Sequence, residues 1–368
     1  GWRNTISGGH RTSIVGGSDN NIKDFSGSTI GGGSWNTITT YFNPSAAGAQ
    51  PFQNTKNQVD SFIGNGKYNT ISGASYSVIV GGSGNTINPA STTGATGLGD
   101  GLSGVTSFIG TGFDNYISGA TQSSILNGSH NIIKFSSIDP DFGSLPDYTA
   151  RLFWGPARKD LLILAGDHNQ ITDYGPQDIP AGVRFNYTTP RKSTIINGRH
   201  NLISGSNAST IVNGKANTIT NNGWDLFGEN TILNGSGNTI DEGWNCWIGG
   251  GAENRIRRNK AGWNDPTMTG GMMIGSWIGS GYMNMLSGVT YSTILNGEGN
   301  AITRSEFSTY NAILNGHSNN IGTIGSDPTK PRTGDMRHAT IVGGASNEIQ
   351  GWSRGAMIGG GQDNKIPG

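Results

Sequence analysis

The stretch "STIINGRHNLISGSNASTIVNGKANTIT", residues 193–220, repeats itself every eight residues, with Ile195, Ile203, Ile211 and Ile219 at that interval. Across the chain the phrase I-x-x-G-x-x-N-x-I occurs sixteen times without a slip in spacing, and its last residue is Ile in every copy except one, where it is Leu286. The first isoleucine of each copy is called the opening Ile below, and the last residue the closing residue. The opening Ile residues are Ile14, Ile30, Ile63, Ile79, Ile109, Ile125, Ile163, Ile195, Ile211, Ile232, Ile248, Ile278, Ile294, Ile313, Ile341 and Ile358.

One full unit has sixteen residues and two short β-branched segments separated by Gly and Asn. The unit is too short for a pair of helices, and its apolar residues do not follow a 3.6-residue spacing. We therefore predict an all-β fold, a parallel β-solenoid of about sixteen 16-residue coils.

Side-chain alternation along each strand assigns the inward positions. The isoleucines must point inward, so the small residue two positions before an opening Ile does the same; examples are Ser28, Ser77, Ser123, Ser193, Ser209 and Ser292. Cys246 occupies this slot and is expected to be a buried thiol without chemistry. The repeated Asn should bond along the stack through its amide, and the repeated Gly should adopt a left-handed corner conformation.

All additional residues lie between a closing residue and the next opening Ile. They should therefore leave the solenoid at the same edge, the arrangement in which loops carry recognition. The prediction is one solenoid domain over residues 1–368, with large insertions at about 39–60, 88–106, 134–160, 172–192, 257–275 and 322–338.

Two of the largest insertions flank the coil of Ile163 and are rich in aromatic and arginine side chains. Such side chains suit sugars, which offer an apolar face and a fringe of hydroxyls. Alternatively, these aromatic side chains pack against one another and form a small hydrophobic core within the insertions. The glycan-binding candidates here and in two further insertions are Tyr148, Arg151, Trp154, Tyr174, Arg184, Tyr187, Trp224 and Trp263.

The two residues that flank each opening Ile point outward, and their sizes compensate each other. Where the first is large the second is glycine, as in Phe62 with Gly64 and Trp277 with Gly279. This compensation is typical of a surface packed to fixed volume, whereas the outward slot on the other strand is mostly polar. We predict a parallel homo-oligomer, and a trimer is the first choice. The alternative is that insertions of the same chain cover this face. The predicted interface residues are Val15, Phe62, Val80, Phe108, Leu126, Ile196, Val212, Leu233, Trp247, Trp277, Leu295, Leu314, Val342 and Met357.

Composition and motifs exclude several classes of function. The formal net charge is zero and 13% of residues are charged, which argues against a nucleic-acid partner. The single cysteine excludes a disulfide framework within the chain and a Cys-based zinc site, and no apolar run approaches the ~18 residues of a membrane-spanning helix. No nucleotide, zinc-protease or EF-hand motif is present, so we expect no cofactor and no metal site.

The remaining titratable residues are ascribed to solvated loops and corners. His130, His168, His200 and His317 lie between the repeated Gly and Asn and are interpreted as solvated corner residues. Glycan cleavage would need two suitably spaced carboxylates, and nothing in the sequence fixes their spacing. The possible carboxylates are Asp139, Asp141, Asp147, Asp160 and Asp173. The chain begins without Met and stops inside a repeat, so we expect a fragment or a processed product.

The segments "STIGGGSWNTI" (28–38), "SFIGNGKYNTISG" (61–73) and "TILNGSGNTI" (231–240) resemble the head repeats, left-handed β-rolls, of trimeric autotransporter adhesins. They are also similar to solenoid stretches of phage tail fibres and other receptor-binding proteins. The likeness runs from Asn4 to Ile366, but the unit is longer than the usual adhesin repeat and the aromatic insertions are atypical of it. The resemblance implies a parallel trimer, an extracellular, cell-surface or virion location, and surface attachment.

Together these observations favour a non-enzymatic fibre or adhesin module that binds cell-surface polysaccharide through its insertions, without nucleic-acid partners or membrane insertion. The alternative is a tailspike-like polysaccharide depolymerase. Ice binding through outward Thr columns is disfavoured because Gln170, Arg255, Glu348 and Lys365 interrupt any regular array. A structural spacer without a ligand remains a further alternative.

Overall fold

The structure is a computed structural model that describes residues 1–39, 60–88, 106–120, 122–134, 160–172, 192–221, 228–258, 273–303, 309–322, 336–351 and 353–367. The chain divides into two compact units. The N-terminal unit comprises Gly1–Phe185 and Thr189–Arg199, and the C-terminal unit comprises Asn186–Thr188 and His200–Gly368. In the described ranges, no helix has the length and apolarity needed to cross a membrane.

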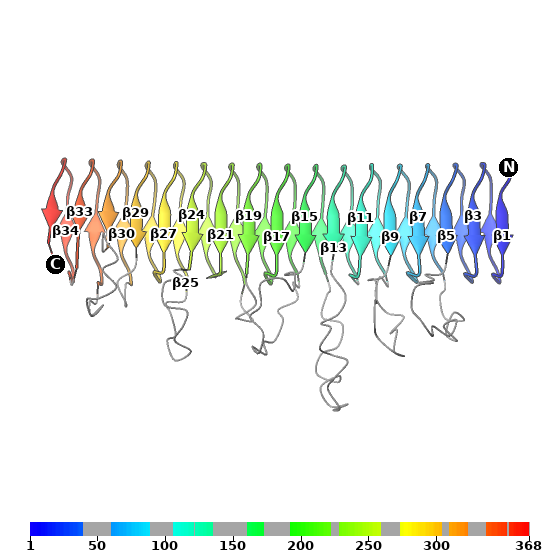
Figure 1. Ribbon diagram of the computed structural model, residues 1–368, viewed down its shortest axis with the longest axis horizontal. Coiled ribbons are helices and arrows are strands. Elements are labelled where there is room, and N and C mark those ends of the chain that lie inside the picture. The colour runs from blue at the N-terminus through cyan, green and yellow to red at the C-terminus, as the bar shows by residue number, and fades with distance from the viewer. Residues whose placement is uncertain are drawn as a thin grey trace, which may run out of the picture. The chain divides into compact units, whose positions relative to one another are not determined.

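Each coil contributes one strand at its opening Ile and one at its closing residue, and like strands stack in parallel (Figure 1). In the N-terminal unit the opening-strand sheet comprises β2 (Ser13–Ile14), β4 (Thr29–Ile30), β6 (Phe62–Ile63), β8 (Val78–Ile79), β10 (Phe108–Ile109), β12 (Ser124–Ile125), β14 (Leu162–Ile163) and β16 (Thr194–Ile195). Its closing-strand sheet comprises β1 (Thr5–Ser7), β3 (Asn21–Lys23), β5 (Thr37–Thr39), β7 (Thr70–Ser72), β9 (Thr86–Asn88), β11 (Tyr116–Ser118), β13 (Ile132–Lys134) and β15 (Gln170–Thr172).

The C-terminal unit has the same two sheets. Its opening-strand sheet comprises β18 (Thr210–Ile211), β20 (Thr231–Ile232), β23 (Trp247–Ile248), β26 (Trp277–Ile278), β28 (Thr293–Ile294), β30 (Ala312–Ile313), β32 (Thr340–Ile341) and β34 (Met357–Ile358). Its closing-strand sheet comprises β17 (Leu202–Ser204), β19 (Thr218–Thr220), β21 (Thr239–Asp241), β24 (Arg255–Arg257), β27 (Met285–Ser287), β29 (Ala301–Thr303), β31 (Asn320–Ile321), β33 (Glu348–Ile349) and β35 (Lys365–Ile366). The short strands β22 (Gly243–Trp244) and β25 (Met273–Ile274) pair separately.

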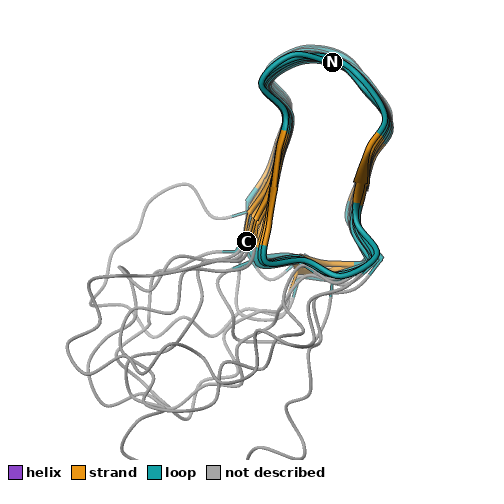
Figure 2. Cartoon of the chain, turned by 90° about the vertical axis from the view of Figure 1, so that its right-hand side faces the viewer, coloured by secondary structure: helices purple, strands orange, loops and turns teal. Residues whose placement is uncertain are grey.

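The register places each isoleucine beside the equivalent isoleucine of the next coil. Ile109 pairs with Ile79 on one side and with Ile125 on the other, and the register is kept across an insertion, where Ile30 pairs with Ile63. Viewed along the stack, the two strand columns of the N-terminal unit lie on opposite sides of the coil (Figure 2). The predicted all-β parallel solenoid is confirmed within each unit, while one continuous domain over 1–368 stays a prediction.

The interior consists of the isoleucine columns and the small residues predicted beside them. The core isoleucines have no exposed surface, apart from partial exposure at chain-end coils, where Ile6 is 46% exposed. The predicted serines are buried, and Cys246 is buried in the same slot. Sequence analysis missed a further buried corner column, which includes Phe25, Ala74 and Ala120 in the N-terminal unit and Met273, Val289 and Met336 in the C-terminal unit.

The repeated Gly has a positive φ in all sixteen copies, from Gly17 (84°) to Gly361 (94°), as predicted. The conformation is only part of the reason for glycine, because the corners also stack closely. A Cβ added at Gly82, where φ is 90°, would lie 2.1 Å from the carbonyl oxygen of Gly112. The residue two positions later is left-handed as well, including non-glycine residues such as Asp114 and His130.

The repeated Asn forms a buried amide ladder within each unit. The Asn36 side-chain Nδ2 donates to Asn20 Oδ1 (3.1 Å), to the Gly32 carbonyl (3.0 Å) and to the Gly66 carbonyl (2.9 Å). Its Oδ1 accepts from both the backbone N–H and the Nδ2 of Asn69 at 3.1 Å. The ladder thus satisfies polar groups that would be costly to bury alone, and it confirms the predicted role of this Asn.

Candidate functional site

The predicted interface residues form an apolar stripe along the opening-strand sheet of each unit, and the name "apolar stripe" is kept for the fourteen residues given above. Every one of them is described, and none is buried within the chain. Exposure ranges from partial, as at Phe108 and Ile196, to 76% at Val15. Large exposed apolar stripes are unusual on a soluble surface and mark sites of association.

Two stacked tryptophans lie in the part of the stripe that belongs to the C-terminal unit. Trp247 on β23 and Trp277 on β26 are paired in register, and their rings stack at 5.8 Å with an interplanar angle of 22°. They remain 41% and 37% exposed. Beside Trp277 the surface is hollowed into an open groove of about 590 Å³, lined by Gly279, Ser280, Leu295, Asn296, Leu314 and Asn315. The stripe therefore offers both a raised aromatic pair and a depression next to it.

The size compensation along the stripe has a cause within the chain. A Cβ built at Gly64 would lie 3.3 Å from the ring of Phe62, and one built at Gly110 would lie 3.4 Å from the ring of Phe108. Each ring thus lies near the glycine two positions later, and the carbonyl oxygen of the next coil is nearer still to the built Cβ, at 2.4 Å for Gly64 and 2.3 Å for Gly110. Packing within the chain is therefore enough to explain the size compensation, with no partner needed. The evidence for an interface is instead the exposure of the apolar stripe.

The closing-strand sheet presents a different surface. Its outward positions include Thr37, Thr70, Arg255 and Lys365, and the Lys365 amine lies 3.0 Å from the Glu348 carboxylate. Met285 on β27 is an apolar exception and is partly exposed. Each unit is therefore mostly polar on one sheet and apolar on the other.

A column of stacked rings lies at the edge where the insertions depart, three residues before the opening Ile. Tyr291 and Tyr310 stack at 5.2 Å with an angle of 11°, and Tyr310 and His338 stack at 5.4 Å with an angle of 5°. The two tyrosines are about half exposed. Gly275 lies against the free face of Tyr291, since a Cβ there would be 2.7 Å from the ring. Sequence analysis did not single out this column, although all three residues share one slot of the repeat.

The glycan-binding candidates lie outside the described residues: Tyr148, Arg151, Trp154, Tyr174, Arg184, Tyr187, Trp224 and Trp263. The same holds for Asp139, Asp141, Asp147 and Asp173. Asp160 is described; it is exposed and adopts a left-handed conformation at the end of an insertion, with φ 61°.

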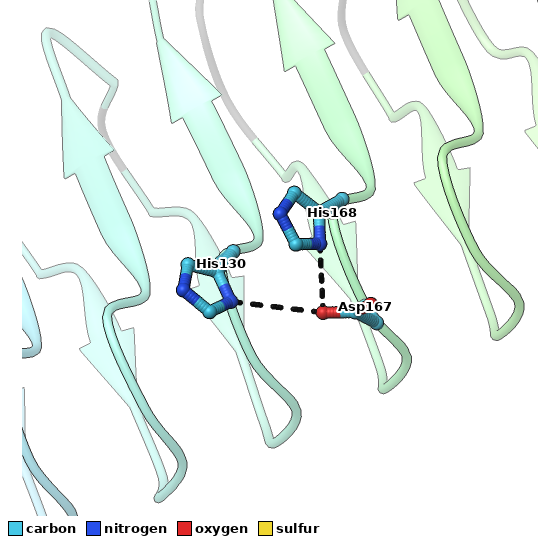
Figure 3. Close-up of side chains that lie close together, drawn as sticks. All are labelled: His130, Asp167 and His168. Carbon is cyan, nitrogen blue, oxygen red and sulfur yellow. Dashed lines mark ion pairs between the residues drawn. The ribbon is translucent and has the colours of Figure 1, made fainter.

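A second cluster, the His–Asp corner, consists of His130, Asp167 and His168 (Figure 3). The imidazole rings of His130 and His168 stack at 4.5 Å with an interplanar angle of 16°. The Nδ1 atom of His168 lies 2.8 Å from Asp167 Oδ1, and the Nδ1 atom of His130 lies 3.7 Å from the same oxygen. The two imidazoles, placed on adjacent coils, thus direct their Nδ1 atoms toward one carboxylate oxygen.

Neighbouring groups fix the charge and position of Asp167. The Ser129 hydroxyl donates a 2.7 Å hydrogen bond to Oδ1, and the Arg199 Nε atom lies 3.1 Å from Oδ2. Together Ser129, His168 and Arg199 lower the pKa of Asp167 to about 2, Ser129 most, despite an opposing rise from partial burial. Asp167 is therefore a carboxylate at any pH above about 3.

Sequence analysis placed these histidines correctly at corners but did not bring them together. His130 and His168 each lie five positions after an opening Ile, Ile125 and Ile163, so they occupy the same slot on consecutive coils. The long insertion between the two coils hides this relation in the linear sequence. Numbering residues by coil position would have revealed it.

No protein-family model matches the chain, and no curated protein matches it.

Proposed function

We propose that the protein is a non-enzymatic fibre or adhesin module that assembles as a parallel homo-oligomer through the apolar stripe. Its insertions and the edge they leave attach to cell-surface glycans. A trimer is the first expectation, and the proposed setting is extracellular, on a cell surface or a virion. The observation that supports this proposal most strongly is the exposure of all fourteen stripe residues.

The stripe has the composition of an oligomer interface. Tryptophan, phenylalanine, leucine and valine dominate it, whereas charged residues cluster elsewhere, and such aromatic enrichment with depletion of charge is typical of interface cores. Trp247 and Trp277 are the natural anchors, because tryptophan is enriched among the residues that contribute most binding energy. The groove beside Trp277 offers room for a side chain from another copy.

A closed, symmetric assembly follows from the regularity of the stripe. The residues recur at the coil spacing on in-register strands, so copies lying parallel bring equivalent coils to the same level. Cyclic symmetry then lets every copy bury its stripe and leaves no apolar surface for open-ended association.

The anchoring role of Trp277 is tested by Trp277→Asp, followed by light scattering coupled to size exclusion. We expect dissociation to monomers, because a carboxylate in the centre of an apolar contact loses its hydration. The matched control is Met285→Asp, which introduces the same charge on the opposite sheet of the same coil and replaces another large apolar residue. Unchanged mass in Trp277→Asp, or equal dissociation in both variants, would contradict the assignment.

Glycan attachment is supported by the placement of aromatic residues at the insertion edge of the C-terminal unit. Tyr291, Tyr310 and His338 are described there, and the candidate insertions, including that of Trp154, occupy the equivalent position of the repeat in the sequence. Aromatic side chains with polar tips bind partners that are partly apolar and partly hydrogen-bonding, which is the character of a sugar ring.

Glycan-array binding by the full chain tests this part of the proposal. We expect binding to a surface polysaccharide that Trp154→Ala or Tyr310→Ala weakens at least about tenfold, the ~1.4 kcal/mol scale of a lost aromatic contact. Tyr68→Ala, which removes an exposed ring from another corner, should leave it unchanged. The chain length of the bound polysaccharide should also be followed. Shortening that is abolished by Asp→Asn changes in the insertions would instead establish a polysaccharide depolymerase.

A further inference from the structure

The geometry points to a divalent transition-metal site at the His–Asp corner, with His130 Nδ1, Asp167 Oδ1 and His168 Nδ1 as protein ligands. Among the divalent transition metals, Zn²⁺ fits this donor set best. The inference is independent of the proposed attachment function, because it depends only on a corner of the N-terminal unit.

The three donor atoms lie close enough to share one ion. They are all within 4.8 Å of one another. The Nδ1–Oδ1 distances of 2.8 Å and 3.7 Å bracket the roughly 3.3 Å separation of neighbouring ligands in a tetrahedral zinc site with bonds of about 2.0–2.1 Å. The stacked rings need a modest rotation to point at one ion, which the exposure of the side chains (41% for His130 and 45% for His168) permits.

The backbone holds the ligands at a fixed spacing. His130 and His168 both adopt left-handed conformations with φ 53°. The backbone N–H of His130 donates to the Phe113 carbonyl, and that of His168 donates to the Ser129 carbonyl, at 2.9 Å and 3.0 Å. The corner lies beside the buried asparagine ladder, where the Asn169 backbone N–H donates to Asn131 Oδ1 at 3.1 Å. The scaffold thus sets the separation of the two imidazoles by the coil spacing.

Surrounding side chains supply outer-shell interactions. Asp114 Oδ2 lies 3.8 Å from His130 Nε2, the ring nitrogen that does not face Asp167. A carboxylate on this side of the ring is one small side-chain movement from the hydrogen bond that commonly orients a metal-binding imidazole. Arg199 engages Oδ2 of Asp167 and leaves Oδ1 toward the histidines. Its charge opposes a cation, but the two carboxylates of Asp114 and Asp167 outweigh the single charge of Arg199.

The donor set selects the metal class. Two imidazoles and one carboxylate suit Zn²⁺, and also Co²⁺ and Ni²⁺, whereas Ca²⁺ and Mg²⁺ prefer oxygen ligands alone. Three protein ligands at an exposed corner leave at least one coordination position for water or an external ligand.

Isothermal titration of the full chain with Zn²⁺ tests the inference. We expect a site with one Zn²⁺ per chain that His130→Gln, Asp167→Asn and His168→Gln each weaken by at least about tenfold, at the low end of the losses seen when a metal site is disturbed. Arg199→Gln should tighten it, since a repelling charge is removed. His317→Gln, at an equivalent corner in the C-terminal unit, is the matched control and should bind as the unchanged chain does.

Absorption of bound Co²⁺ provides a readout that depends on the ligands themselves. A visible d–d band that is lost in His168→Gln but kept in His317→Gln would support direct ligation. Circular dichroism without metal should show that all variants keep the solenoid. Absence of a one-to-one Zn²⁺ site, or a site that the three ligand variants bind with the same affinity as the unchanged chain, would overturn the inference.

Discussion

At the scale of single residues, the close approach of neighbouring corners limits which residue types the repeat can contain. Gly82 lies where φ is positive and where the next coil's backbone leaves no room for a side chain. Gly81 precedes it on the same corner, yet a Cβ there would meet nothing nearer than 3.8 Å. Adjacent glycines thus serve different purposes, and only the repeated one is required by geometry.

We expect Gly82→Ala to lower the free energy of unfolding by about 3 kcal/mol or more, because a left-handed backbone and a steric clash act together. Gly81→Ala should change it by less than about 1 kcal/mol. Denaturant midpoints measure the difference. Equal midpoints for the two variants would show that the corners are less tightly packed than described.

Cys246 is a second residue whose behaviour follows from its slot. Burial raises the pKa of its thiol to about 11, while its Sγ atom contacts the carbonyl oxygens of Met273 (3.4 Å) and Trp244 (3.5 Å). The thiolate is the reactive form, so alkylation of the native chain should be at least about 100-fold slower than that of a free thiol, because both the raised pKa and the burial of Sγ oppose it.

The same slot contains Ser276 one coil further on, so Cys246→Ser should keep the denaturant midpoint close to that of the unchanged chain. Rapid labelling of native protein by iodoacetamide would contradict the buried assignment. Labelling should become fast only when the chain is unfolded.

At the scale of strands and coils, the asparagine ladder joins each coil to the next. Asn69 receives the backbone N–H of Asn85 on its Oδ1 (3.1 Å), and its Nδ2 donates to the Gly82 and Asn65 carbonyls. Removing the side chain leaves these buried groups without their partner, and each unsatisfied group costs about 1–3 kcal/mol.

Asn69→Ala should therefore lower the free energy of unfolding by about 2–4 kcal/mol. Thr70→Ala, at the neighbouring outward position of β7, should change it by only a few tenths of a kcal/mol. Urea denaturation followed by circular dichroism compares the two. A small effect at Asn69 would mean that water replaces the amide and that the ladder contributes little.

The strands and corners could be predicted from sequence because the period repeats their physical requirements in every coil. Isoleucine, glycine and asparagine each occur in one environment of the coil. Ile79 lies in the core, Gly82 in the left-handed corner and Asn85 in the amide ladder. The buried corner column escaped prediction because Phe25, Ala74 and Val289 differ in size and share no residue type. The His–Asp corner was not predicted because a long insertion separates its two coils. His130 and His168 are therefore not one repeat length apart in the sequence.

The candidate residues in the insertions, including Trp154 and Tyr174, could be proposed only from composition. No repeat runs through those segments, so the sequence offers no period from which to assign their positions. The apolar stripe is the opposite case. Its position follows from strand alternation, and its exposure in the structure agrees with the placement deduced from the repeat.

At the scale of the whole molecule, the exposed stripe has to be reconciled with solubility. A single chain would present tryptophan, phenylalanine and leucine side chains to water on a sheet, which favours association. The proposed parallel assembly would bury them and leave the polar sheet and the insertion edge accessible for the proposed attachment. Oligomerisation is thus the claim on which the proposed function depends.

The most direct measurement is the mass of the unchanged chain in solution, determined by light scattering or sedimentation over a range of concentrations. The account predicts a stable homo-oligomer, with three times the chain mass of 38.5 kDa as the first expectation. A monodisperse monomer at micromolar concentration, with the stripe residues accessible to solvent, would contradict it.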